Sequence, residues 1–157
     1  MKEIIYKLLI FFLFLPIILS SCQTNKECDI STESLLKANF YIMDGEEEQA
    51  VFVDPISVYG LGREDSLLYE NDSISSVFLP LSPVSETLGF VFAIATYKDT
   101  ISFTYETKTY LESIECGFIS NYSIDSIKYT QNVIDTIILI KKGVTIEDED
   151  HVKIFFK

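Results

Sequence analysis

Residues that commonly build metal centres and catalytic sites are scarce in this sequence. It has one histidine, His151, and three cysteines, Cys22, Cys28 and Cys116, in 157 residues. None of them shows the close cysteine and histidine spacing of a zinc site. No G-x-S-x-G segment supplies a serine nucleophile for a histidine base. We therefore expect no metal, no cofactor and no catalytic residue.

Basic residues are also few. The chain has 12 Lys and Arg against 24 Asp and Glu, which makes a formal net charge of −12. A surface of this sign repels nucleic-acid phosphates and anionic lipid headgroups. We therefore expect no nucleic-acid partner. An acidic excess is common among soluble domains, so the charge alone does not name a cationic partner.

A long run of purely apolar residues occurs near the N-terminus. Leu8–Leu19 carries no charge and follows Lys2 and Lys7. Its length of about a dozen residues suits the hydrophobic region of a signal peptide, and it is too short for a helix that spans ~30 Å of hydrocarbon. The alternatives are a secretory signal with an incidental cysteine and a transmembrane anchor.

The end of this run, Leu19-Ser20-Ser21-Cys22, resembles the lipobox of bacterial lipoproteins. The resemblance implies cleavage before Cys22, a diacylglyceryl thioether on its sulfur, and acylation of the new N-terminus, with palmitate among the acyl chains. Two or three such chains hold a protein firmly in a lipid bilayer. In enteric bacteria, an Asp directly after the lipidated cysteine is the usual signal for retention in the inner membrane. Cys22 is followed by Gln23 instead. We therefore expect a lipoprotein of the outer membrane on its periplasmic side, with display at the cell surface left open.

The sequence divides into three segments. Residues 1–21 are expected to be the signal peptide, residues 22–34 the lipidated cysteine and a polar tether, and residues 35–157 a folded domain. Removal of the signal peptide leaves 136 residues with 23 acidic and 10 basic side chains. This length suits one domain with its own core.

Two cysteines remain after Cys22 is acylated. Cys28 and Cys116 would then lie in a compartment that permits disulfides. A bridge between them would close a long loop, which the chain-entropy model values at ~4–5 kcal/mol. The sequence leaves both a disulfide and two free thiols open, because it does not place the two Cα atoms.

Alternating apolar residues predict strands throughout the mature chain. Ile101, Phe103 and Tyr105 alternate with polar residues, as in a half-buried strand. Leu88–Tyr97 is apolar at both parities, which predicts a central strand covered on both faces. We count eight or nine such runs and no sustained helical period. The pattern predicts an all-β domain, a single antiparallel β-sandwich of about eight or nine short strands.

Turns are predicted where polar residues interrupt these runs. We place turns at Asp44–Glu48, at Glu70–Ser73 and at Lys98-Asp99. Pro55 predicts an edge strand or a bulge, because proline lacks the N–H that a sheet requires.

Several polar groups are candidates for chemistry. The acidic runs Asp44–Glu48 and Glu147–Asp150 offer carboxylates to Ca²⁺, but neither matches an EF-hand loop and such runs are usually only solvated. Glu112 and Glu115 could form a glycosidase pair only if their separation in space is suitable. His151 is interpreted as a surface residue beside an acidic turn. The eight tyrosines after Cys22 either form a binding face or reflect strand propensity.

Three stretches resemble a known family. They are Val58–Arg63 with Asp65–Leu67, Glu115–Phe118 and Glu149–Phe155. From Cys28 to its end the chain resembles a family of uncharacterised Bacteroidetes lipoproteins, a domain of unknown function. The resemblance implies a location in the cell envelope and a single β-rich domain. It supplies no catalytic residue.

The expected function is non-enzymatic. We expect a membrane-anchored module for binding or assembly in the envelope, whose partner is a protein or a glycan. The alternative is a small periplasmic hydrolase, with or without a metal. A pocket that joins His151 to carboxylates would favour the hydrolase, whereas an exposed face rich in tyrosine would favour binding.

The lipobox interpretation makes a direct prediction. Cys22→Ala removes the sulfur that is acylated, so the precursor should stay uncleaved and unlipidated. Intact mass and partitioning into detergent measure both steps. Normal cleavage and detergent partitioning of the variant would contradict the interpretation.

Overall fold

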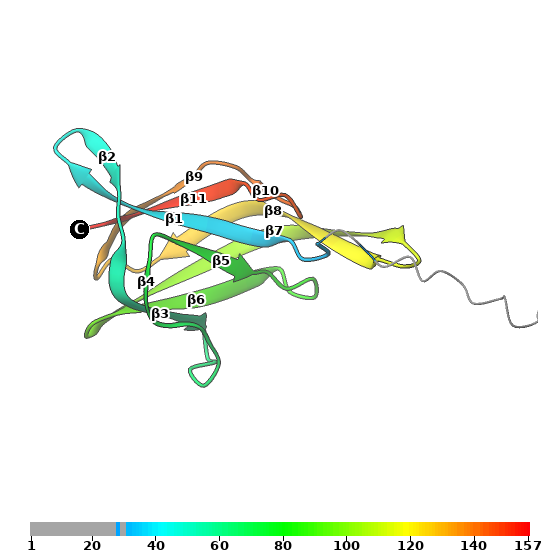
Figure 1. The fold of residues 1–157 in the computed structure, drawn as a ribbon, viewed down its shortest axis with the longest axis horizontal. Coiled ribbons are helices and arrows are strands. Elements are labelled where there is room, and N and C mark those ends of the chain that lie inside the picture. The colour runs from blue at the N-terminus through cyan, green and yellow to red at the C-terminus, as the bar shows by residue number, and fades with distance from the viewer. Residues whose placement is uncertain (1–27, 29–30) are drawn as a thin grey trace, which may run out of the picture.

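Two β-sheets packed face to face make up the protein (Figure 1). The computed structural model describes residue 28 and residues 31–157. The signal peptide, Cys22 and most of the predicted tether therefore lie outside the described residues. The strands are β1 (Leu35–Asp44), β2 (Glu47–Ala50), β3 (Val53–Gly60), β4 (Leu67–Ile74), β5 (Ser76–Pro80), β6 (Thr87–Ile94), β7 (Tyr97–Ser113), β8 (Gly117–Tyr129), β9 (Ile134–Leu139), β10 (Gly143–Val144) and β11 (Asp150–Phe156).

The first sheet, sheet A, has the order β2-β1-β11-β9, and β5 pairs with the first half of β1. The second sheet, sheet B, has the order β10-β8-β7-β6-β3-β4. Neighbouring strands are antiparallel except for β1 and β11, which run parallel. The first and last strands of the described chain thus lie side by side in sheet A.

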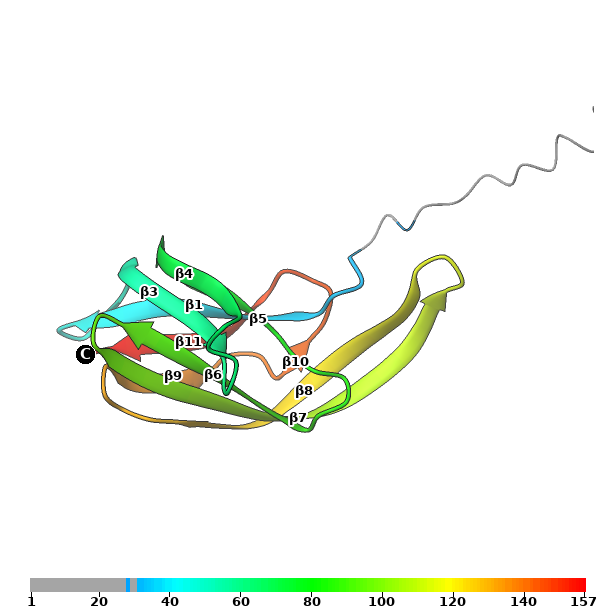
Figure 2. The ribbon, with the colours of Figure 1, turned by 90° about the horizontal axis from the view of Figure 1, so that it is seen from below.

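The prediction of an all-β sandwich is confirmed, and the structure adds two features to it. One is the parallel pairing of β1 with β11. The sequence pattern does not predict it, because alternation within a strand carries no information about the direction of the neighbouring strand. The other is strand length, since β7 has 17 residues and β8 has 13. Their paired ends extend as a hairpin beyond the other strands (Figure 2).

Two predicted turns are wrong. The turn assigned to Lys98-Asp99 lies at Ala95 and Thr96, where Ala95 has a φ of 52°. Pairing of Ile94 with Tyr97 closes this two-residue hairpin, and such a turn can require a positive φ at its first central residue alone. The residues of the second predicted turn, Glu70–Ser73, lie within β4. An Asp72 carboxylate oxygen accepts the Glu70 N–H there at 3.1 Å, and the register with β3 is irregular at this point. The turn-forming residues therefore produce an irregularity inside a strand.

Two other local predictions are confirmed. The β3–β4 register shifts between Val53 and Ile56, which is the bulge predicted at Pro55. In β6 the consecutive residues Phe90, Val91 and Phe92 are all buried, as expected for a strand covered on both faces. No helix in the described part of the chain is long and apolar enough to cross a membrane.

Phe40 lies where the two sheets meet. This fully buried ring of β1 makes edge contacts with Phe92 of sheet B at 6.4 Å between ring centroids and with Phe156 of β11 at 5.3 Å. Aromatic pairs with this geometry are favourable beyond the area that they bury. The ring therefore contacts both layers of the core.

Removal of this ring should destabilise the whole domain. Phe40→Ala leaves a cavity between the sheets and should lower the free energy of unfolding by about 4 kcal/mol. Chemical denaturation of the mature protein measures the change. Phe118→Ala is the matched control, because Phe118 is 70% exposed and its loss should change stability by less than about 0.5 kcal/mol. Equal effects of the two substitutions would contradict this account of the core.

Candidate functional site

An apolar groove lies at the end of the sandwich that holds the C-terminus. It has a volume of about 560 Å³ and is formed by the segment between β2 and β3, the β6–β7 turn and the end of β11. Its lining residues are Ile42, Val51, Phe52, Val53, Asp54, Ile94, Tyr97, Asn132, Val133, Phe156 and Lys157. We call it the C-terminal groove. Phe52 is 73% exposed and Tyr97 is 58% exposed, so two large aromatic side chains at this site face water.

Charged groups of both signs border the C-terminal groove. The β1–β2 hairpin beside it carries the acidic run Asp44–Glu48, and Asp54 belongs to its lining. Lys157 lies at the other side, where its Nζ donates to the carbonyl oxygens of Gln131 at 2.5 Å and Asn132 at 3.2 Å. Lys157 therefore forms hydrogen bonds with backbone oxygens, whereas the β1–β2 hairpin adds negative charge beside the groove.

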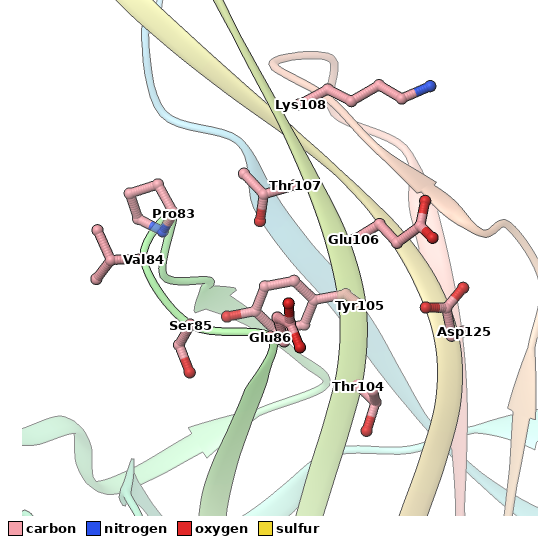
Figure 3. Close-up of a pocket in the computed structure, with 10 residues that line it drawn as sticks. All are labelled: Pro83, Val84, Ser85, Glu86, Thr104, Tyr105, Glu106, Thr107, Lys108 and Asp125. Atoms are coloured by element: carbon pink, nitrogen blue, oxygen red, sulfur yellow. The ribbon is translucent and has the colours of Figure 1, made fainter.

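A second hollow, the polar hollow, lies between the loop after β5 and the middle of β7 (Figure 3). Its volume is about 570 Å³, and its lining combines residues 83–86 and 104–108 with Asp125. Glu106 of β7 and Asp125 of β8 project beside each other, and both are exposed (Figure 3). Among the described residues, no three Cys, His, Asp or Glu side chains are grouped as metal ligands.

Lysines pair with Glu48 in the first acidic run considered for Ca²⁺ and with Asp148, Glu149 and Asp150 in the second. Lys153 forms an ion pair with Glu48, and Lys141 forms one with Glu149. Lys37 lies 3.0 Å from an Asp148 carboxylate oxygen and contacts Asp150 as well. The first pair links β11 to β2, the second lies between β9 and β11, and Lys37 links β1 to the start of β11, so the pairs do not converge on one point.

Cys28 and Cys116 form a disulfide with their Cα atoms 5.0 Å apart. Cys116 lies in the turn of the β7–β8 hairpin, where its N–H donates to the Ser113 hydroxyl oxygen at 2.9 Å. The bridge spans 88 positions of sequence and joins the chain before β1 to the far end of this hairpin. Glu112 and Glu115, which were considered as a glycosidase pair, lie at this same exposed end and outside both hollows.

His151 is buried, so its interpretation as a surface residue is wrong. The β1–β11 register pairs Lys37 with Asp150 but Ala38 with Val152, which leaves His151 as the extra residue of a bulge. Its Nδ1 accepts the Lys37 backbone N–H at 3.1 Å. The imidazole therefore satisfies a backbone donor that the irregular ladder leaves unpaired.

The protonation of His151 follows from this position. Burial lowers the pKa of the imidazole, and the Glu149 carboxylate and the Gly143 carbonyl act in the opposite direction. A neutral ring is also required for Nδ1 to accept a hydrogen bond. His151 thus has a structural role within sheet A, and no solvent-facing lone pair is available to it as a general base.

Asp99 is also buried, and it holds the connection between β8 and β9. One carboxylate oxygen accepts the Thr130 hydroxyl at 2.5 Å and the Asn132 N–H at 2.8 Å. The other accepts the N–H groups of Val133 at 2.7 Å and Ile134 at 2.9 Å. Burial by itself raises the pKa of Asp99, but these four hydrogen bonds together hold it below its ordinary value.

The model of a family of unknown function, DUF6452, matches residues 55–156. The chain belongs to this family. The DUF6452 match runs from the start of β3 to the end of β11 and contains Asp99, His151 and the β7–β8 hairpin. No curated protein and no solved structure matches the chain.

The sequence did not reveal that Asp99 and His151 of this DUF6452 chain are buried. A signal for Asp99 existed, because it shares the parity of Ile101, Phe103 and Tyr105, whose side chains face the core. Its acidic character made it look like a turn residue instead. No signal marked the C-terminal groove, since its lining comes from segments that are distant in sequence.

The tyrosines do not gather on one face. Tyr59, Tyr105 and Tyr122 are buried, whereas Tyr97 and Tyr110 are exposed at opposite ends of β7. The Tyr105 hydroxyl donates to the Ser82 carbonyl oxygen at 3.1 Å and accepts the Ser82 N–H at 3.0 Å. Most tyrosines therefore serve the core or its loops.

Replacement of Asp99 should reveal its role through pH. Asp99→Asn keeps the size of the side chain but presents N–H donors to backbone N–H groups, and should cost about 3 kcal/mol at neutral pH. The pKa of Asp99 is lower in the folded protein than its ordinary value of 3.8. Its contribution is therefore complete above that value and is lost as the pH falls through the folded pKa. The variant should accordingly show a shallower loss of stability in acid than the unaltered protein.

Denaturation midpoints measured from neutral to acidic pH test this prediction. Asp125→Asn is the control, because the Asp125 carboxylate is exposed and its replacement should leave the profile unchanged. An acid profile of Asp99→Asn identical to that of the unaltered protein would contradict the prediction.

Proposed function

We propose that this chain is a lipid-anchored lipoprotein of the outer membrane, related to envelope lipoproteins of the Bacteroidetes type, whose β-sandwich binds another envelope protein. The proposed anchor is Cys22, on the strength of the apolar run and the lipobox resemblance. The proposed activity is binding without catalysis. The observation that carries it is the C-terminal groove with its exposed aromatic residues.

Exposed aromatic side chains beside a hollow are suited to protein recognition. Phe52 and Tyr97 project into water at 73% and 58% exposure, next to the partly buried Val51 and Phe156. Large aromatic residues next to a pocket are the groups that most often dominate binding energy. The groove can receive an apolar side chain between them.

The charge around the groove indicates the chemistry of the partner. The acidic run Asp44–Glu48 and Asp54 lie beside an apolar lining, and the mature chain is strongly acidic overall. A partner segment with an apolar anchor flanked by Lys or Arg would complement both features. We therefore propose a basic, apolar segment of another envelope protein as the occupant.

The groove also has a suitable position. The C-terminus and the tip of the β7–β8 hairpin lie at opposite ends of the molecule (Figure 2). The disulfide holds Cys28, six positions after the proposed anchor, at the hairpin end. The C-terminal groove would then face away from the membrane, where a partner can reach it.

The hydrolase alternative has little support from the geometry. It depended on a pocket that joins His151 to carboxylates, and His151 is buried with Nδ1 accepting the Lys37 amide. His151 lines neither the C-terminal groove nor the polar hollow. We therefore favour binding over hydrolysis.

Site-specific photocrosslinking in intact cells tests the proposed function. A photoreactive phenylalanine analogue at position 52 should produce a discrete crosslinked protein. Mapping of the product should place the crosslink beside Lys or Arg in the partner. Adding Tyr97→Asp should strongly reduce the yield, because it places a charge in the apolar lining.

Leu61 supplies the matched controls. It is 60% exposed and lies in the loop between β3 and β4, outside the groove. The analogue at position 61 should give no product, and Leu61→Asp should leave the crosslink at position 52 unchanged. Absence of a product at position 52, or the same product at both positions, would overturn the proposal.

A further inference from the structure

The far end of the β7–β8 hairpin presents apolar side chains to water. Ile114 in the turn is 91% exposed, Phe118 is 70%, Leu111 is 54% and Tyr110 is 41%. Leu111 and Phe118 are directly paired across the two strands, so their side chains lie on the same face. We call these four residues the hairpin tip.

The four residues of the hairpin tip lie outside the hydrophobic core of the sandwich. Side chains of β7 facing the core are buried up to Tyr105, and residues 108–112 are all exposed. The tip therefore extends past the sandwich core (Figure 2). Apolar residues at this position contribute little to the stability of the core. Exposed apolar residues that are grouped in this way are typical of a surface that interacts with another molecule or a membrane.

The disulfide fixes where the tip lies relative to the proposed anchor. Cys116, in the turn itself, is bonded to Cys28, and their Cα atoms are 5.0 Å apart. Cys22 precedes Cys28 by six residues. Six extended residues reach at most about 21 Å. The acylated residue and the hairpin tip would therefore lie within one short tether of each other.

We propose that the hairpin tip inserts its apolar side chains into the interfacial region of the lipid bilayer that holds the anchor. This inference rests on the proposed lipid anchor at Cys22. The acyl chains keep the tip at the membrane surface, so even a weak affinity of the tip for lipid is sufficient for occupancy. The domain would then stand on the bilayer at two points, the anchor and the tip.

The charges on the tip define the kind of membrane and the depth of insertion. Glu112 and Glu115 flank Ile114 and are exposed. Carboxylates are repelled by anionic headgroups and do not enter hydrocarbon readily. The tip therefore suits a zwitterionic surface and a shallow position, at the boundary between headgroups and acyl chains.

The sequence contains no tryptophan, which allows a clean fluorescence test. Ile114→Trp places a single reporter in the tip, and Phe52→Trp places one in the C-terminal groove as the control. Each full lipidated protein is added to phosphatidylcholine vesicles with and without brominated acyl chains. In vesicles the Ile114→Trp reporter should emit at shorter wavelength and lose much of its fluorescence to bromine near the headgroup end of the chains, whereas the Phe52→Trp reporter should show neither change.

A second variant tests the paired residues of the tip. Leu111→Asp with Phe118→Asp, added to Ile114→Trp, should abolish the quenching while the circular dichroism melt is retained, because both side chains are exposed. Unchanged quenching in this variant would overturn the claim that these side chains contact lipid.

Two further measurements separate the tip from the anchor. The mass of the N-terminal peptide reports acylation of Cys22, and vesicle flotation reports anchoring. Acylated protein that floats with an unquenched reporter at position 114 overturns the tip proposal and leaves the anchor standing. Protein that is neither acylated nor floated overturns both. The crosslink at position 52 is scored independently of either result.

Discussion

The chain leaves sheet B and enters sheet A between β8 and β9, and a single buried carboxylate organises that crossing. Backbone N–H groups at a crossing have no strand partner, so they need another acceptor. Asp99 of β7 accepts three consecutive N–H groups there, from residues 132–134, together with the Thr130 hydroxyl. β9 pairs with β11, and β11 pairs with β1. The position of the C-terminal strands in sheet A therefore depends on a carboxylate of sheet B that accepts these hydrogen bonds.

The two ends of the molecule differ in chemistry. One end combines the C-terminal groove with the acidic β1–β2 hairpin, and the other carries the disulfide and the apolar hairpin tip. The sandwich lies between these two surfaces (Figure 2). This separation suits a protein whose proposed anchor and proposed partner lie on opposite sides. Asp99 and His151 belong to the scaffold between these surfaces, because both accept hydrogen bonds from backbone N–H groups and neither lines the C-terminal groove.

Much of the fold was predictable because strand periodicity is a local property. The alternation around Ile101 and Phe103, the bulge at Pro55 and the doubly covered β6 were all inferred from short windows of sequence. Errors arose where a residue's usual preference conflicted with its tertiary setting. Aspartate is a residue type common in turns, but Asp99 has the same parity as the core-facing residues of β7. Its side chain is buried with theirs because four hydrogen-bond donors compensate the cost of burying its charge. The acidic neighbours of His151 favour a surface position, whereas a bulge where β11 pairs with β1, a strand distant in sequence, buries it.

The sequence by itself determined the all-β class, the division between an apolar N-terminal run and an acidic domain, and the three cysteines available for chemistry. These properties follow from composition and from patterns within a few residues. Tertiary structure alone decided the parallel pairing of β1 with β11, the contact of Cys28 with Cys116, and the lining of the C-terminal groove. Each of these joins segments that are far apart in the chain. Their proximity depends on how the two sheets pack, which no local pattern specifies.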